Sequence, residues 1–199
     1  LDPLGLEGFL LGGEEAAGAE VAELVAVGSP PSQGELQQLF GTTEVDLGEV
    51  TPEILLNFNL PEVRRVGIPG GGGISDAASI ALLYQHLLHD PDRTWSPSVR
   101  AEGTARIHCD LVDPLRGVPA NRTLGLVLAG DDGASALRGM GHGVSGRAFG
   151  HNGAAGQIAW ADPETGMSFA FCTSAVERDF IHEARRTAAI STRASDLVV

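Results

Sequence analysis

One short segment holds the residues with the clearest potential for chemistry, Gly150-His151-Asn152-Gly153. A histidine side chain can donate or accept a proton near neutral pH, and it can also bind a carboxylate. Glycine has no Cβ, so it allows a second backbone to approach closely. His151 is therefore a candidate for acid–base chemistry or for substrate binding. The alternative is a structural histidine near the end of a strand.

A β-hairpin is expected to position this segment. Two stretches with the alternation of a strand, 157–162 and 167–173, flank the turn Pro163-Glu164-Thr165-Gly166. Proline fixes φ early in such a turn, and glycine supplies a positive φ at its end. Cys172 alternates with its neighbours in the second stretch, which predicts a small buried side chain in a strand.

The rest of the pattern predicts helices first and strands later. The helix at 75–89 has the strongest pattern, because its apolar residues share one face and Ser75 can cap its N-terminus. A closing helix is predicted at 175–190, with Phe180, Ile181, Ala184 and Ala188 facing inward. Other helices are expected at 14–27, near 35–40 and from Thr51, and other strands near 104–112, 123–130 and 146–151. Antiparallel strands covered by helices make an α+β fold.

Several segments together resemble the penicillin-recognising serine hydrolases, which include class C β-lactamases, D-Ala-D-Ala carboxypeptidases and related esterases. The Gly-His-x-Gly edge before a late hairpin is similar to the third active-site motif of that family. Further similar segments follow in the family's order, and they are Leu1-Asp2-Pro3-Leu4-Gly5-Leu6, Ile68-Pro69-Gly70-Gly71-Gly72-Gly73-Ile74-Ser75-Asp76-Ala77-Ala78, Trp95-Ser96-Pro97-Ser98-Val99 and Leu124-Gly125-Leu126.

The resemblance implies a β-lactamase/transpeptidase-like fold, with this chain as its C-terminal half. Residues 1–103 would form a helical and loop region, and residues 104–199 would form the antiparallel strands and the C-terminal helix. The other strands and the opposing N-terminal helix would come from a preceding half of the same fold. That half is the first expected partner.

The resemblance also implies roles for four residues. His151 would take the position of the family's Lys, Arg or His at the edge of the substrate groove. Asn152 would replace the usual Ser or Thr that contacts substrate, and Gly153 would leave room for the substrate backbone. The backbone N–H of Ala154 would be the second oxyanion donor. No metal or cofactor is expected.

The chain contains no lysine, and its only tyrosine is Tyr84 in the predicted helix. The family carries its nucleophile in Ser-x-x-Lys and a further catalytic group in Tyr-x-Asn. A serine hydroxyl needs a nearby base before it can attack a carbonyl. We therefore expect both motifs in the preceding half, with this chain inactive alone. The complete protein is expected to be a serine hydrolase that forms an acyl-enzyme from a small ester or a β-lactam. The ester is favoured. The alternative is a catalytically silent module with a binding or regulatory role.

Other ligand-binding patterns lack their usual context. The segment 141–146 matches the dinucleotide pattern Gly-x-Gly-x-x-Gly, but no helix is predicted after it. Gly70 to Gly73 precede a helix, yet the lysine of a phosphate-binding loop is missing. His86 and His89 have a spacing that suits metal ligands, but no third ligand is evident, so solvated histidines are favoured.

Composition limits the class of partner. The formal net charge is −13 over 199 residues, which argues against binding to nucleic acid or to an anionic membrane surface. No apolar run approaches the ~20 residues that span a bilayer. Cys109 and Cys172 do not suggest a disulfide framework or a metal cluster. The second expected partner, a small-molecule ester or β-lactam substrate, is the one that the family resemblance implies.

Overall fold

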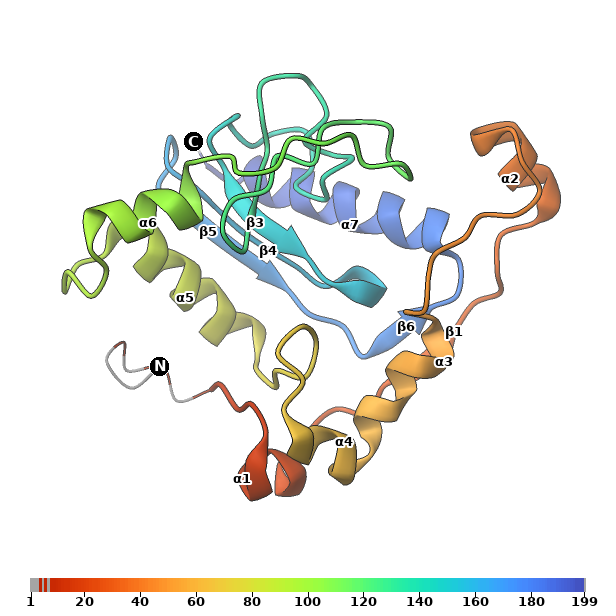
Figure 1. Ribbon diagram of the computed structural model, residues 1–199, viewed down its shortest axis with the longest axis horizontal. Helices are drawn as coiled ribbons and strands as arrows, with labels where there is room; N and C mark the ends of the chain where they lie inside the picture. The colour runs from red at the N-terminus through yellow and green to blue at the C-terminus, as the bar shows by residue number, and fades with distance from the viewer. Residues whose placement is uncertain (1–3, 5, 7, 199) are drawn as a thin grey trace.

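The computed structural model describes residues 4, 6 and 8–198. Four antiparallel strands form its central sheet in the order β2-β3-β4-β5 (Figure 1). Their bounds are Val127–Leu128 for β2, Phe149–Asn152 for β3, Ile158–Asp162 for β4 and Met167–Phe171 for β5. The sheet is covered by α5 (Ala77–His89) on one face and α7 (Phe180–Ser195) on the other. This arrangement confirms the predicted α+β fold.

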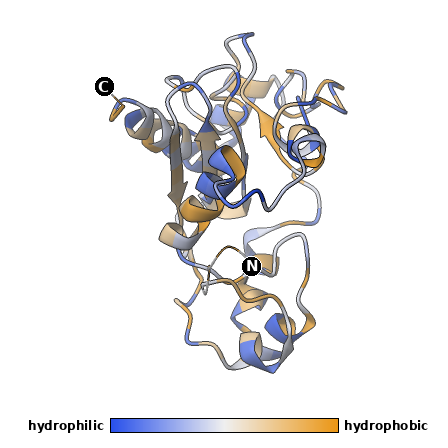
Figure 2. Cartoon of the chain, turned by 90° about the vertical axis from the view of Figure 1, so that its left-hand side faces the viewer, coloured by the Kyte–Doolittle hydropathy of each residue, from blue (hydrophilic) through white to orange (hydrophobic). Residues whose placement is uncertain are grey.

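The elements before the sheet are short helices and one strand. They are α1 (Gly13–Gly18), β1 (Val25–Val27), α2 (Gln33–Phe40), α3 (Pro52–Leu55), η2 (Leu56–Asn59), α4 (Pro61–Val66) and α6 (Pro97–Thr104). Helices α1 and α4 pack together at the end of the molecule away from the sheet (Figures 1 and 2). The buried Arg64 ties them, because its guanidinium donates to the carbonyls of Ala17 at 3.1 Å and Ala19 at 3.3 Å.

Strand β4 shows why the sheet has a helix on each side. Successive side chains of a strand point to opposite faces. Ile158 and Trp160 join the cluster that also contains Ala194 of α7, whereas Ala159 and Ala161 join the cluster that contains Tyr84 of α5. All of these β4 residues are buried. Both faces are therefore apolar, and each needs a covering helix.

The α7 side of the core contains one polar contact. Trp160 is 1% exposed and Ser191 is 0% exposed. The indole Nε1–H of Trp160 donates to the Ser191 hydroxyl at 2.7 Å. A buried donor that loses its acceptor bears its full desolvation penalty, about 1–3 kcal/mol. We expect Ser191→Ala to lower the free energy of unfolding by that amount, as measured by urea denaturation.

A double-mutant cycle separates this hydrogen bond from packing. In a Trp160→Phe background the same Ser191→Ala change should cost much less, because no indole donor is left without an acceptor. Equal costs in both backgrounds would mean that the serine acts only through its volume.

The local predictions around the hairpin are confirmed. Strands β4 and β5 pair antiparallel across the turn at 163–166, with Gly166 at φ 72°. The helix predicted at 75–89 is α5, although its N-cap is Asp76 and not Ser75. The Asp76 carboxylate accepts the backbone N–H of Ser79 at 2.9 Å. Helix α2 confirms the helical segment near 35–40, and it begins with a capping box formed by Ser32 and Glu35.

Several boundaries differ from the predictions because distant segments pair. The helix expected at 14–27 ends at Gly18, and Val25–Val27 forms β1 instead. This strand pairs in parallel with β6 (Ala175–Glu177), which takes the first residues of the helix expected at 175–190. The strand expected near 104–112 is replaced by the end of α6 and by isolated bridges at Cys109 and Val112.

Two predicted burials are also wrong. Ala184 of α7 is exposed, and the face of this helix that packs on the sheet carries small and polar residues such as Thr187 and Ser191. Cys172 lies just beyond β5 and is exposed. Of the similar segment at 1–6, only Leu4 and Leu6 lie within the described residues, and both are largely buried.

Candidate functional site

Strand β3 and the turn after it position the candidate residues. His151 pairs with Ala159 of β4. One residue beyond the strand, the Gly153 N–H donates to the Gln157 carbonyl at 2.7 Å, so the register of the sheet continues to that point. The chain then turns through the 3-10 helix η3 (Ala154–Gly156) before β4 begins. The sheet therefore fixes the backbone on both sides of this turn.

Gly153 has an extended backbone, with φ −90° and ψ 168°. Any residue can adopt this conformation, so a positive φ does not account for the glycine. A Cβ at this position would lie 3.0 Å from the Cβ of Gln157, whose side chain is held by two hydrogen bonds to the backbone of Thr173. The glycine therefore avoids a close contact with Gln157.

The backbone N–H of Ala154 is available to a ligand. It is the first residue of η3, and the N–H groups at the start of a helix have no partner within that helix. No hydrogen bond among the described residues uses this N–H, and Ala154 is exposed. The next residue, Ala155, has φ 62°, an uncommon conformation for a residue with a Cβ. This turn therefore leaves an unpaired backbone donor on an exposed residue, three positions after His151.

Two contacts orient the His151 ring. Its Nδ1 lies 2.6 Å from the Asn152 carbonyl oxygen, and its Nε2 lies 3.3 Å from Nη1 of Arg122. Partial burial of the ring lowers the pKa of His151, and the positive charges of Arg122 and Arg116 lower it further. The Asn152 carbonyl acts in the opposite direction. The ring is therefore held in its neutral form to lower pH than an ordinary histidine.

His151 and Gly153 line one cavity of ≈ 230 Å³. It opens between α5 and the strands β3, β4 and β5, which contribute apolar walls. Its lining residues are Ile80, Tyr84, His151, Gly153, Gln157, Ile158, Ala159, Phe171 and Cys172. An apolar hollow with a few polar groups at its rim is the usual form of a small-molecule site.

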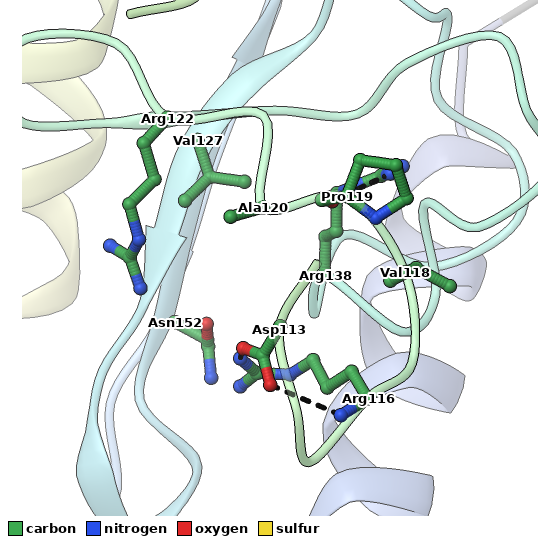
Figure 3. Close-up of a pocket in the computed structure, with 9 residues that line it drawn as sticks. All are labelled: Asp113, Arg116, Val118, Pro119, Ala120, Arg122, Val127, Arg138 and Asn152. Carbon is green, nitrogen blue, oxygen red and sulfur yellow. Dashed lines mark hydrogen bonds and ion pairs between the residues drawn. The ribbon is translucent and has the colours of Figure 1, made fainter. Parts of the chain in front are cut away.

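Asn152 does not line that cavity, because alternation along β3 turns it to the other face. It lies in a neighbouring hollow of ≈ 20 Å³, about the size of one water molecule, with Arg116, Arg122 and Arg138 (Figure 3). Arg116 pairs there with Asp113 at 2.8 Å. Arg122 therefore lies between the two hollows and contacts His151 in the first.

Sequence reasoning did not identify Tyr84, Cys172 or Arg122 as residues of this region. Tyr84 is 7% exposed, and burial raises the pKa of its hydroxyl. Partial burial, together with the negative charge of Asp76, raises the pKa of the Cys172 thiol. Both are therefore uncharged at neutral pH. The helical pattern around Tyr84 and the spacing of Cys172 gave no chemical signal, since tertiary packing alone brings them to the cavity.

The glycine-rich segment and one of the helical histidines that also matched ligand-binding patterns make contacts within the fold. The glycine-rich segment 141–146 packs against the last turns of α7, where a Cβ on Gly141 would lie 2.5 Å from the backbone N of Thr192. Strand β3 follows it, where a dinucleotide site would have a helix. His89 contacts the Gly166 carbonyl at 3.3 Å. Within residues 4, 6 and 8–198, no group of three His, Cys, Asp or Glu side chains is placed to hold a metal ion.

No helix in the described part of the chain is both long enough and apolar enough to cross a membrane.

The site consists of a sheet between two helices, with His151 on β3 and an unpaired N–H in the turn after that strand. The model of the beta-lactamase family matches residues 1–193, so the chain belongs to the beta-lactamase family. This match confirms the resemblance to penicillin-recognising serine hydrolases. No curated protein matches the chain.

Solved structures share the fold at low sequence identity. A penicillin-binding protein homologue from Caulobacter crescentus is similar with a TM-score of 0.66 and 22% identity, over 98% of this chain and 49% of that one. EstA from Arthrobacter nitroguajacolicus Rue61a is similar with a TM-score of 0.58 and 18% identity, over 92% of this chain and 49% of that one. The chain therefore spans about half the length of these relatives.

Proposed function

We propose that this chain forms one wall of the active site of a serine hydrolase that acts through an acyl-enzyme. The observation that carries the proposal is the unpaired N–H of Ala154 beside His151 and Gly153 at the rim of an apolar cavity. An acyl-transfer site needs a backbone donor where an oxyanion develops, and one such donor is worth ~3–4 kcal/mol of the barrier. Membership of the beta-lactamase family supports the same assignment.

His151 would act in this site as a neutral proton acceptor. A backbone carbonyl can only accept a hydrogen bond, so the contact with Asn152 places the ring proton on Nδ1. The Nε2 lone pair then remains for a proton that moves during acylation. Its present contact with Arg122 is long at 3.3 Å, and Arg122 is exposed, so a substrate or a catalytic hydroxyl can replace it.

The nucleophile would come from a preceding half of the same fold. The described residues contain no lysine, and Tyr84 is buried in α5, so neither Ser-x-x-Lys nor Tyr-x-Asn can be formed from them. Strand β5 supports this proposal, because it pairs with β4 and is the last strand of the sheet on that side. An unpaired strand edge is a site where further strands of the same fold can add.

A small carboxylic ester suits the site better than a β-lactam. His151-Asn152-Gly153 stands where β-lactam recognition in the family uses a lysine triad, and a neutral histidine does not supply that positive charge. Asn152 faces the second hollow beside Arg116 and Arg122, which has room for about one water molecule, so a substrate in the first cavity would contact His151 and Gly153 and not this amide. The apolar walls of the first cavity would hold the acyl chain.

The 199-residue chain alone should not hydrolyse p-nitrophenyl butyrate or nitrocefin above the rate of a buffer blank. The physical reason is that these residues contain neither the Ser-x-x-Lys motif, which would supply the nucleophile and its lysine, nor the Tyr-x-Asn motif. The measurement is a spectrophotometric assay on the purified chain, whose identity is verified by intact mass. Clear turnover by this chain would contradict the proposal.

The full-length protein, in contrast, is expected to be active in the same assay. It should carry Ser-x-x-Lys followed by Tyr-x-Asn upstream, and it should release p-nitrophenol with an initial burst as the acyl-enzyme forms. Nitrocefin should be the poorer substrate. A full-length protein without these motifs and without turnover would support a silent binding module instead.

A further inference from the structure

Arg122 is the charged residue that contacts His151, and its backbone is held on both sides. It lies in the loop between α6 and β2, where its N–H donates to the Cys109 carbonyl at 2.8 Å. Its own carbonyl accepts the N–H of His108 at 2.7 Å. The side chain is exposed and reaches the candidate histidine, with Nη1 3.3 Å from Nε2 of His151. The backbone therefore fixes the base of this side chain, while its end remains free to move.

The two contacts of the His151 ring determine its protonation. The carbonyl oxygen of Asn152 is only an acceptor, so Nδ1 at 2.6 Å must carry a hydrogen. A guanidinium is only a donor, so Nε2 opposite Arg122 must carry a lone pair. A doubly protonated ring would place an N–H against an N–H and a positive charge against another. Only the neutral ring with its proton on Nδ1 satisfies both contacts.

Among the described residues, the negative charge of Asp76 acts on Cys172 of the cavity wall, but it is not among the charges that act on His151. The ionisable side chains that line the cavity with His151 are Tyr84 from α5 and Cys172 after β5. Burial of the hydroxyl and of the thiol raises the pKa of both groups, so both are neutral near pH 7. From the loop before β2, Arg122 and Arg116 are the charges that act on His151. Burial of the ring lowers the pKa of His151 most, and Arg122 is the stronger of these two charges, since Arg116 is already paired with Asp113 at 2.8 Å.

We propose that Arg122 is a positioning residue that keeps His151 neutral, with the ring proton on Nδ1 and the lone pair on Nε2. The effect of Arg122 on catalysis rests on the proposed function of His151 as a proton acceptor. The protonation state of the ring follows from its two contacts and does not depend on that function. Because His151 must be unprotonated to accept a proton, Arg122 extends toward acidic pH the range over which His151 can do so.

Nuclear magnetic resonance of the full-length protein with isotope-labelled histidine tests the proposal directly. The signals of His151 are assigned by their loss in His151→Gln. The ¹⁵N shifts should show a protonated Nδ1 and an unprotonated Nε2. In Arg122→Gln the pKa of His151 should rise toward its ordinary value, and in Arg122→Lys, which keeps the charge, it should stay low. Arg147→Gln is the matched control, because Arg147 is exposed and does not act on His151.

Two results would overturn the proposal. One is a proton on Nε2 in the unaltered protein, which is a measurement that needs no variant. The other is a His151 pKa that responds equally to Arg122→Gln and Arg147→Gln. A full-length protein without hydrolase activity would refute the proposed function and leave both resonance measurements valid, so the two failures are distinguishable.

Kinetics provide a readout that a merely structural role would not change. In Arg122→Gln the acidic limb of the kcat/KM profile should move to higher pH. Near pH 6 we expect a loss of up to about 4-fold, because a histidine with the ordinary pKa of about 6.5 is only about one-quarter neutral there, and the loss should largely disappear by pH 8. Arg122→Lys should retain the unaltered profile. A uniform loss at all pH values would contradict the assigned role.

Discussion

His151→Ala in the full-length protein is expected to lower kcat/KM by on the order of 10–1000-fold, the range for loss of one positioned proton acceptor. The fold should survive, because His151 is exposed and contributes no side chain to either core cluster. The measurement is steady-state hydrolysis of p-nitrophenyl butyrate, together with a thermal melt.

The matched control is His86→Ala on α5, which should leave turnover unchanged because His86 does not line the cavity. Unaltered kinetics in His151→Ala would refute the acid–base role. Loss of activity in the His86 variant alone would place the functional site on the helix.

The pH dependence of kcat/KM follows from the lowered pKa of His151. Above that pKa the ring is neutral and can accept a proton, and below it the ring is protonated and cannot. The ordinary value for histidine is near 6.5, so activity should persist below pH 6.5 and fall only as the pH passes the lowered value. The free enzyme's pKa is read from kcat/KM. A limb at or above 6.5 would mean that the ring is not held neutral.

Local signals were sufficient to predict the hairpin that carries the site. Alternation in 157–162 and the pair Pro163 and Gly166 encode a two-stranded unit through adjacent residues alone, and β4 and β5 form with that register. The capped pattern before 75–89 likewise predicted α5. Such elements need no information from distant parts of the chain.

The incorrect boundaries arise where distant residues compete with local propensity. Val25–Val27 was assigned to a helix because alanine and glutamate favour one, yet these residues pair with Ala175–Glu177, about 150 positions later. That same pairing removed the first turn of the helix expected at 175–190. Long-range pairing of this kind has no signature in a single short window.

The candidate site was also only partly predictable. His151, Gly153 and Ala154 lie on one short segment, so the motif at 150–154 was enough to find them. Arg122 could not be found in this way, because a loop of irregular structure brings it to His151 from 29 positions earlier. Asn152 was expected beside His151 at the substrate, but alternation along β3 turns it into the neighbouring hollow.

Gly153→Val should remove turnover while leaving the protein folded. Its backbone is extended, a conformation that valine favours in strands, and the nearest obstacle is the side chain of Gln157 at 3.0 Å. We expect the free energy of unfolding to fall by about 1–3 kcal/mol, because Gln157 is held by its hydrogen bonds to Thr173 and must shift slightly. The new side chain would occupy the cavity rim beside the Ala154 N–H, and kcat/KM should fall by on the order of 100-fold or more, because small displacements of a reacting carbonyl have effects of this size.

Gly150→Val, three residues earlier on the same strand, is the control that separates the two reasons for a glycine. A Cβ at Gly150 would lie 2.3 Å from the Ala159 carbonyl oxygen and 2.8 Å from the Cα of Trp160, and neither backbone atom can move away without disturbing the sheet. This variant should lose about 3 kcal/mol or more of stability. Paired thermal melts and esterase assays on both variants give the comparison. If Gly153→Val instead unfolds like Gly150→Val and its folded fraction keeps normal specific activity, this glycine serves only the turn, and the cavity beside it is not where the substrate lies.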